Sequence, residues 1–269
     1  MTLSNSIAGQ IEADMCDWLD NILEKKKSEY AKASIDVGHA EPIGQIKPFH
    51  KALLPKSFTR MSSFERSFST LLGKSHERHS AIIAKSRFAK TELQHKTEGT
   101  IYESVDTEIS DEVERINKGH TFSNYFDVVE KIVNMEERGS GNRVSRSVNS
   151  DLYLKSHDGD EIFFEIKTSK PSKEQCLNIT RKHLWIHAMR KLVQPKVKTY
   201  FAMAYNPYGE GNEYRHSFAK RHLDIERQTL IGKPYWDYLG GDGTYEDLLD
   251  VYRRVGITKS KEINKILEI

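Results

Sequence analysis

One stretch of this chain, NSDLYLKSHDGDEIFFEIK at residues 149–167, can fold back on itself in a register that buries all of its aliphatic residues together. Successive residues of a strand point to opposite faces of a sheet, so an alternating apolar pattern marks a strand with one buried face. The first half of the stretch alternates at Leu152 and Leu154, and the second half alternates at Ile162, Phe164 and Ile166. The stretch therefore predicts a β-hairpin.

The residues between the two strands select the register. The sequence at 157–159, His-Asp-Gly, is typical of a three-residue hairpin loop with its glycine in the left-handed conformation. With that loop, Leu152 faces Phe164 and the apolar side chains gather on one face. A two-residue turn at 158–159 would place Leu152 across from Glu165, and such a slip is strongly disfavoured when one face is buried.

The same register brings Asp151 opposite Glu165, with Lys167 further along the same face. Mg²⁺ takes oxygen ligands and keeps several waters, so one or two carboxylates suffice to hold it. The metal stabilises charge on a phosphate and lowers the pKa of a bound water, and an ammonium group can hold or activate that water. The three side chains therefore indicate metal-assisted phosphodiester hydrolysis. The alternative is a half-buried hairpin whose exposed face carries a salt bridge worth about 0–1 kcal/mol.

This arrangement resembles the PD-(D/E)xK nuclease superfamily, in which an aspartate precedes a Glu-x-Lys on the next strand. Asp151 and the segment 165–167, Glu-Ile-Lys, match that pattern, although Ser150 stands where the pattern has proline. The resemblance also implies that a helix before the hairpin supplies another carboxylate to the metal. Glu77 is the candidate, with Glu65 in reserve, and the alternative for either is a solvated helix face.

Length and composition limit the possible folds and cellular locations of the chain. A chain of 269 residues can form one large domain, or one core with helical additions. A net charge of +2 means that any surface for nucleic acid is local, and two cysteines give no disulfide framework. No apolar run approaches the roughly 20 residues that span a membrane. The N-terminus lacks the basic start and apolar core of a signal peptide, so we expect a cytoplasmic protein.

Helical patterns precede the hairpin. Residues 6–33 have an amphipathic pattern that predicts a helix, and residues 34–58 predict a connector rich in prolines. A second helix is expected to begin at Ser62 or Ser63, and it carries Glu65 and Glu77. Two histidines on this second helix, His76 and His79, are expected at the surface.

Charge alternates along the next part of the chain. Residues 98–117 are acidic and are expected to turn away from DNA, and residues 122–136 predict a helix. Residues 138–146 predict a flexible basic loop leading into the hairpin. Arginines beside a phosphodiester-cleaving site could contact phosphates or a guanine edge, so Arg143 and Arg146 are candidate DNA-binding residues.

Two basic stretches follow the hairpin. Ser172 is expected to cap a helix that runs to about Val193 and carries Arg181 and Lys182 as candidate DNA contacts. The segment 183–187 has the histidine spacing of a zinc helix without its catalytic glutamate, so both histidines are expected near the surface or the DNA, not as ligands. A buried strand is predicted at 197–204. The second basic cluster contains Arg215, Lys220 and Arg221, with a solvated charged face as the alternative.

Three further stretches carry a more specific resemblance. AYNPYGEGNEY, LIGKPYWDYLGG and GTYEDLL, together with the earlier FERSFSTLLG, resemble the TdeIII/MjaII-type family of Type II restriction endonucleases from about Pro48 to Gly256. The resemblance implies a homodimer that binds double-stranded DNA, requires Mg²⁺ and cuts both strands at a short palindromic site such as GGNCC. It also implies a cognate DNA methyltransferase, and it supports Asp151, Glu165 and Lys167 as the site.

The expected fold is α/β, with a restriction-endonuclease-like core in which helices flank a mixed sheet. The expected organisation is one compact domain overall, with an N-terminal helical segment and connector at 1–58, a nuclease core at 59–235 and a C-terminal helical segment at 236–269 that holds a helix from Thr244. A structure-specific nuclease of the junction-resolvase or repair type, on the same core, is one alternative. A non-catalytic DNA-binding protein, whose acidic hairpin is only structural, is the other.

Overall fold

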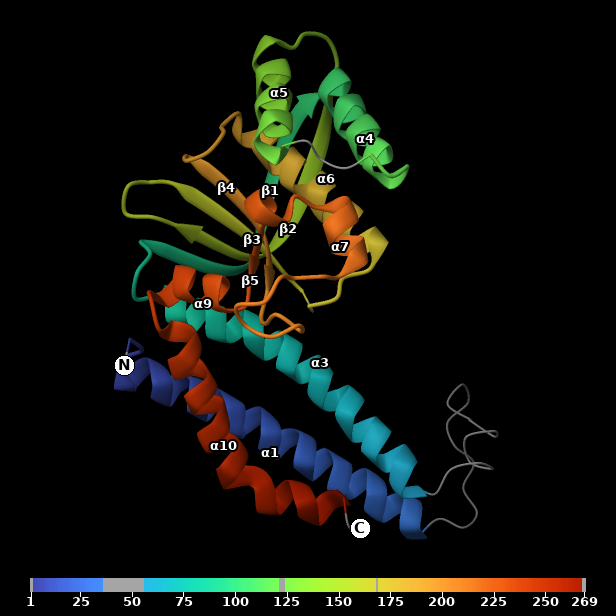
Figure 1. Ribbon diagram of the computed structural model, residues 1–269, viewed down its shortest axis with the longest axis vertical. Coiled ribbons are helices and arrows are strands. Elements are labelled where there is room, and N and C mark those ends of the chain that lie inside the picture. The colour runs from blue at the N-terminus through green and yellow to red at the C-terminus, as the bar shows by residue number, and fades with distance from the viewer. Residues whose placement is uncertain (1, 36–55, 121–123, 168, 268–269) are drawn as a thin grey trace. The chain divides into compact units, whose positions relative to one another are not determined.

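The computed structural model describes residues 2–35, 56–120, 124–167 and 169–267. The chain forms two compact units, one made of Met1–Thr2 and His76–Glu246, and the other of Leu3–Ser75 and Asp247–Ile269 (Figure 1). The first unit contains every strand of the described chain and all the residues predicted for the catalytic site. Among the described residues, no helix combines the length and apolar character needed to cross a membrane.

The first unit is built on a five-stranded sheet. Its strands stand in chain order, and they are β1 (Lys90–Tyr102), β2 (Arg143–Lys155), β3 (Glu161–Lys167), β4 (Val197–Met203) and β5 (Thr229–Ile231). The pairs β1–β2 and β2–β3 are antiparallel, whereas β3–β4 and β4–β5 are parallel. The prediction of an α/β fold with a mixed sheet is therefore confirmed.

The hairpin of β2 and β3 has the predicted register. Leu152 pairs with Phe164 and Leu154 pairs with Ile162. The loop closes through a hydrogen bond of 2.9 Å from Ser156 N to Asp160 O, and Gly159 has a φ of 88°, which a glycine adopts without steric cost. The hairpin is buried on both faces, however, rather than on the one face that its aliphatic pattern suggested.

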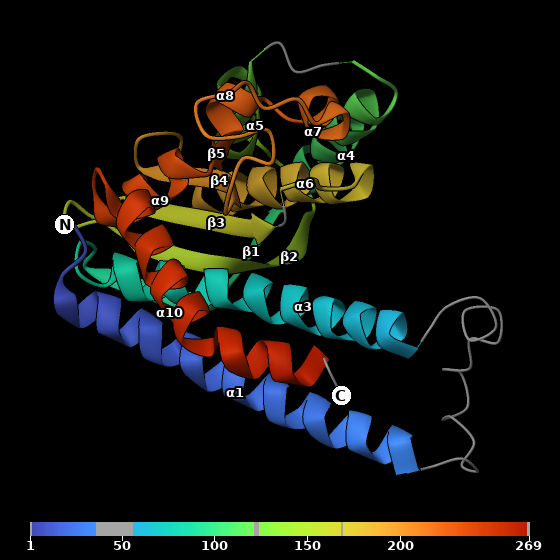
Figure 2. The same cartoon turned by 60° about the horizontal axis from the view of Figure 1, so that its bottom comes forward.

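One face of the hairpin packs against α6 (Lys173–Arg190), which begins with a capping box formed by Ser172 and Gln175. Ile186 of this helix joins Tyr153 and Phe163 in one buried cluster. Two outer helices, α4 (Glu103–Asn117) and α5 (Tyr125–Arg138), pack against α6 in turn (Figure 2).

The opposite face of the hairpin packs against α9 (Lys233–Gly240), where the rings of Tyr235 and Tyr238 lie 5.7 and 5.9 Å from the ring of Phe164. Two short helices, α7 (Ser217–His222) and α8 (Ile225–Gln228), lie between β4 and β5 in the chain, and Ala219 and Ile225 extend a cluster formed by Cys176 and Phe201. The sheet is thus covered on both faces, and this accounts for the burial of the hairpin.

The second unit is helical. It contains α1 (Asn5–Ile35), the first part of α3 (Lys56–Ala84) and most of α10 (Thr244–Leu267). Trp18 packs on Phe68 with ring centroids 5.4 Å apart. The helix predicted at 6–33 is confirmed, and most of the connector predicted at 34–58 lies outside the described residues.

Several boundaries differ from the prediction. The helix expected to begin at Ser62 or Ser63 begins at Lys56, and the Ser63 hydroxyl accepts a hydrogen bond of 2.9 Å from Lys26 Nζ instead of capping. The helix expected at 122–136 is α5, and residues 121–123 lie outside the description. The strands β1 and β5 and the helix α9 were not predicted from the sequence. The flexible loop expected at 138–146 is wrong in its second half, because β2 begins at Arg143.

Candidate active site

Asp151 immediately precedes Leu152, the first residue of β2 that is paired with β3. Here the Asp151 carboxylate, rather than a backbone carbonyl of β2, accepts a hydrogen bond from the backbone of β3. Asp151 Oδ2 accepts hydrogen bonds of 2.8 Å from the backbone N–H of Ile166 and of 2.8 Å from Lys167 Nζ. The residue is only 8% exposed. A buried carboxylate needs such partners because removing its charge from water is costly. The hairpin therefore fixes the position of this carboxylate relative to β3.

Glu165 is held by two lysines. Its Oε1 lies 3.1 Å from Lys167 Nζ on the same strand, and Lys182 Nζ of α6 lies 2.9 and 3.0 Å from its two oxygens. Glu165 is 7% exposed. The structure thus brings together Asp151, Glu165 and Lys167, as the register predicted, and adds Lys182 from a helix that the hairpin pattern does not include.

The charge of Lys167 is fixed by these neighbours. Burial is the largest single influence and lowers its pKa, but Glu165 and Asp151 together outweigh burial, so the pKa of Lys167 is raised above its usual value. Lys167 is therefore a cation at neutral pH. In this state it can donate hydrogen bonds and offset negative charge, but it cannot accept a proton from water.

Glu77 of α3 approaches the same centre through an intermediary. Gln94 Nε2 donates a hydrogen bond of 2.9 Å to Glu77 Oε2 and lies 3.4 Å from Asp151 Oδ1. Gln94 Oε1 accepts a bond of 2.6 Å from Asn149 Nδ2, which fixes the orientation of the amide. Burial, and then the charge of Asp151, raises the pKa of Glu77. Glu77 is thus placed beside the site, whereas its reserve, Glu65, accepts a bond from Ser69 in its own helix.

Gln94 was not predicted from the sequence as a residue of the site. The pairs on either side of it are Leu93 with Leu152 and His95 with Ser150, so it lies across from Asp151 in β1. Its φ is 51°, a left-handed conformation that is uncommon for a residue other than glycine. Such backbone outliers cluster at functional sites, where the surroundings hold them in place. No local sequence signal marks the position, because β1 pairs with a strand about fifty residues away.

A hollow of about 330 Å³ opens beside the two carboxylates and lysines. Its walls come from the end of β3 and from one face of α6, and they are formed by Glu165, Lys167, Gln175, Asn178, Ile179, Arg181, Lys182 and Trp185. Apart from Ile179 and Trp185, every lining side chain is charged or carries an amide. The hollow therefore suits a polar, negatively charged ligand better than an apolar one.

The carboxylates fit a hard divalent cation by their chemistry, since Asp151 and Glu165 offer oxygen ligands on one face of the hairpin. Both lie within contact distance of the ammonium of Lys167, so a single cation can reach both at once. Across the described residues, no group of three or more histidine, cysteine, aspartate or glutamate side chains is arranged to hold a metal ion. Asp151 and Glu165 are thus the two carboxylates placed to hold a cation together, with water or substrate oxygens as further ligands.

The candidate DNA-binding arginines of β2 are already paired. Arg143 Nη2 lies 2.6 Å from Glu136 Oε1, and its guanidinium stacks over Tyr102 at 4.3 Å. Arg146 binds both oxygens of Asp106 at 2.8 and 2.5 Å. One acidic residue of the stretch 98–117 therefore faces the arginines rather than standing apart from them.

The other candidate DNA contacts lie on α6 and on the segment around α7. Arg181 lines the hollow and lies 3.2 Å from Asn178 Oδ1 on the same helix. Arg215, Lys220 and Arg221 are exposed on the segment that leads into and through α7. Arg215 and Lys220 both pair with Glu213. Lys182 differs from these because the carboxylate that it contacts, Glu165, is buried.

Two histidines of α6 and one of α3 correct the sequence-based expectation of a surface position. His183, His187 and His79 are all buried. His187 Nδ1 lies 2.8 Å from Leu192 O and Nε2 lies 3.2 Å from Thr199 Oγ1. Since a carbonyl only accepts, Nδ1 carries the proton and Nε2 accepts from Thr199. Burial lowers the pKa of His187 to about 4, so it is a neutral core residue.

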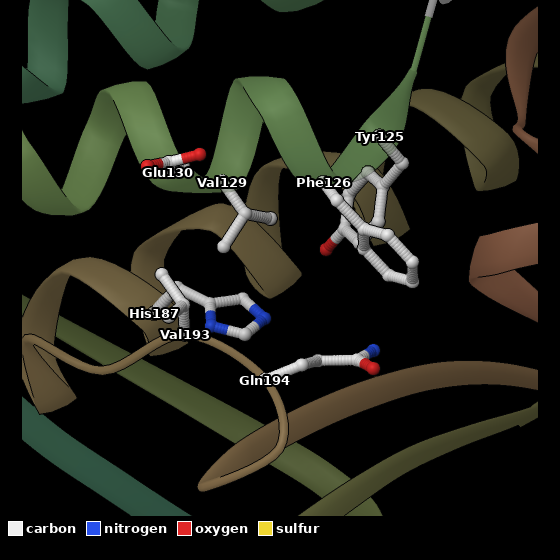
Figure 3. Close-up of a pocket in the computed structure, with 7 residues that line it drawn as sticks. All are labelled: Tyr125, Phe126, Val129, Glu130, His187, Val193 and Gln194. Carbon is white, nitrogen blue, oxygen red and sulfur yellow. The ribbon is translucent and has the colours of Figure 1, made fainter.

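His187 also lines a separate small cavity of about 200 Å³ beneath α5, shown in Figure 3 with Tyr125, Phe126 and Val129 above it. The Tyr125 hydroxyl lies 2.9 Å from Thr199 Oγ1, which completes a chain of buried hydrogen bonds. His76 is partly buried, and burial together with His79 lowers its pKa to about 4. These histidines are thus buried or partly buried in the packing of the helices, and their spacing in the sequence did not indicate this burial.

A carboxylate pair with a lysine at the end of a hairpin, beside a polar hollow, forms a candidate hydrolytic centre. Comparison with known proteins assigns the class of the whole chain. The family of Type II restriction endonucleases represented by HinfI matches residues 7–256. The chain belongs to this HinfI family, and it is a site-specific nuclease of the restriction class.

Three restriction enzymes of Herpetosiphon aurantiacus are similar over nearly their whole length. The chain is 33% identical to the Type II restriction enzyme HgiBI over 262 residues, which covers 93% of this chain and 95% of HgiBI. It is 31% identical to HgiCII over 264 residues and 33% identical to HgiEI over 262 residues, with the same coverage. The expected class of Type II restriction endonucleases is confirmed. The matching family is that of HinfI, so the TdeIII/MjaII-type subfamily is not confirmed.

Proposed function

We propose that this chain cleaves DNA at a PD-(D/E)xK-type site made of Asp151, Glu165 and Lys167, with Glu77 as an accessory carboxylate and Mg²⁺ as the cofactor. The observation that carries the proposal is the shared ammonium of Lys167, which lies 2.8 Å from Asp151 Oδ2 and 3.1 Å from Glu165 Oε1. Two buried acids from neighbouring strands therefore converge within reach of one cation, and one of them, Glu165, lines the polar hollow.

Each residue of the proposed site has a separate role. Asp151 and Glu165 would hold Mg²⁺, which supplies charge stabilisation on the phosphate and a more acidic water. Lys167, as a cation, would donate to the attacking oxygen and offset charge on the phosphate. Gln94 would keep Glu77 and Asp151 in place through its amide. Correct positioning of the reacting groups contributes much of the rate in such a reaction.

The DNA would lie along the hollow and the basic face beside it. Arg181 and Lys182 of α6 and the exposed residues Arg215, Lys220 and Arg221 are the proposed backbone contacts. The role proposed from the sequence for Arg143 and Arg146, contact with phosphates or bases, stays a prediction. Their pairing with Glu136 and Asp106 favours a role in holding the sheet edge.

The target and the partners extend the family assignment. A restriction enzyme that cuts both strands at a palindromic site matches the two-fold symmetry of that site most simply as a homodimer. We propose such a dimer, a cognate DNA methyltransferase that protects the host, and GGNCC as the first site to test. The relatives are Type II restriction enzymes by name, and this supports site-specific cleavage over the structure-specific and non-catalytic alternatives.

The test is to incubate the protein with a sequenced plasmid and Mg²⁺, and to map the ends of the products. Discrete fragments with ends at one short palindrome are expected, and no fragments when Mg²⁺ is removed with a chelator. Preference for branched over linear DNA would favour a structure-specific nuclease, and binding without cutting would favour a non-catalytic protein. The same fragments compared with GGNCC sites decide the proposed target.

A further inference from the structure

Lys182 occupies a position that the proposed mechanism leaves unexplained. Its ammonium lies 2.9 and 3.0 Å from the two oxygens of Glu165, so both oxygens of one proposed cation ligand face this lysine. It also lies 3.4 Å from the backbone oxygen of Asn149 on β2.

The charges at the site determine how this contact affects the binding of a divalent cation. Asp151 and Glu165 together carry two negative charges, and Lys167 and Lys182 together offset them. A divalent cation added to this arrangement would meet two ammonium groups beside its ligands, and like charges at such distances repel. One lysine therefore has to leave the carboxylates when a cation binds.

Lys182 is the lysine that can leave. Lys167 contacts both Asp151 and Glu165 and extends from a strand that is paired on its β4 side over its full length. Lys182 contacts only Glu165 among the acids and extends from α6 on a long flexible side chain, on the wall of the hollow beside Arg181. Both ammonium groups stand on the same four-carbon chain, so the lysine with one acidic partner, Lys182, gives up fewer charged contacts when it moves than Lys167 does.

We propose that Lys182 is a built-in counter-ion that competes with the divalent cation for Glu165 in the DNA-free protein and is released toward the DNA phosphate when the cation binds. This inference rests on the proposed function, because it takes Glu165 as a cation ligand. Cation binding and DNA binding are then coupled, since each favours the released position of the same side chain.

The test measures Mn²⁺ binding to the DNA-free protein by electron paramagnetic resonance, a readout independent of cleavage. Lys182→Met is expected to bind Mn²⁺ at least about fivefold more tightly than the wild type, because a competing charge is gone. Lys173→Met, which removes the same charge from the start of the same helix, is the matched control and is expected to change the affinity less than about twofold. Glu165→Gln combined with Lys182→Met is expected to lose the gain.

Cleavage provides a second readout. The Mg²⁺ concentration for half-maximal rate is expected to fall in Lys182→Met, while the rate at saturating Mg²⁺ falls about tenfold because the phosphate loses a cation. Equal Mn²⁺ affinity in the wild type and in Lys182→Met, or no binding by either, would overturn the inference. Failure of the proposed function is distinguished separately, because it would appear as full cleavage by Asp151→Asn whatever Lys182 does.

Discussion

The two ends of strand β2 both carry buried or half-buried ion pairs, but they use different cations. At the end that enters the hairpin, Asp151 pairs with Lys167, and the neighbouring Glu165 is shared by Lys167 and Lys182. At the other end, Arg143 and Arg146 pair with Glu136 and Asp106. The same strand thus contributes a lysine-bound acid, Asp151, near one end and two acid-bound arginines, Arg143 and Arg146, near the other.

The difference lies in how replaceable the cation is. Arg146 binds Asp106 through two nitrogens and lies 5.3 Å over the ring of Trp185, so its guanidinium is fixed in geometry. A lysine ammonium is a point charge on a flexible chain, and an oxygen-seeking cation can replace it. Arginine pairs therefore hold the sheet edge together, whereas lysine pairs leave their acids available for chemistry.

The strongest test of this contrast exchanges one acid at each end. Asp151→Asn is expected to lower the cleavage rate by about 10³-fold or more while the thermal unfolding temperature changes little, because it removes a ligand and a charge from the site. Asp106→Asn is expected to show the reverse pattern. Rates on a plasmid substrate and unfolding curves of both variants measure the contrast, and full cleavage by Asp151→Asn would refute the site.

A second test exchanges the cations. Lys167→Arg keeps the charge but replaces a compact ammonium with a planar group, so the cleavage rate is expected to fall by about 10²-fold. Arg146→Lys keeps the charge at the other end and loses the bidentate contact, with little expected effect on cleavage. Single-turnover rates measure both. Equal losses of rate at the two ends would mean that the arginine end also takes part in catalysis.

The third test removes the arginine. Arg146→Met leaves Asp106 half-buried without its main cation, so the free energy of unfolding is expected to fall by about 1–2 kcal/mol. Urea unfolding measures this fall, and DNA affinity in the absence of Mg²⁺ is expected to stay within about threefold. If affinity fell steeply while stability held, Arg146 would be the DNA contact that the sequence predicted.

The smallest expected effect depends on pH. Asp151 and Glu165 raise the pKa of Lys167, and a raised lysine pKa contributes stability that is present below the usual value of 10.5 and is lost as pH rises through the folded value. The stability difference between wild type and Lys167→Met should therefore shrink only above pH 10.5. The difference for Arg146→Met should persist there, since Asp106 raises the pKa of an already more basic group. Urea midpoints at stepped alkaline pH values compare the two.

The hairpin and its acids could be predicted because they depend on local rules. A period of two, a glycine loop and the burial of aliphatic residues determine that Leu152 faces Phe164, and the position of Asp151 follows. The helix after Ser172 was predictable for the same reason, since its cap lies within its own first turn.

The remaining parts of the site depend on contacts between distant segments. β1 has no clean alternation, and its partner strand lies about fifty residues away, so neither the strand nor the left-handed Gln94 was visible in the sequence. Lys182 resembled a solvated or DNA-facing lysine because the pattern of α6 does not show which side faces Glu165. The histidines of α6 look polar in sequence, yet the packing of α5 and β4 encloses them.

Strand β3 has neighbours on both edges, with β2 antiparallel on one side and β4 parallel on the other. Glu165 and Lys167 extend from this strand, which is paired with β4 over its full length, whereas Glu77 and Lys182 reach the centre from helices. When substrate binds, we therefore expect the side chains from the helices to move while the backbone of β3 stays in place. Amide hydrogen exchange should accordingly stay slow along β3 in every liganded state, and the response to loading should appear in α6 and in the His76–Ala84 part of α3.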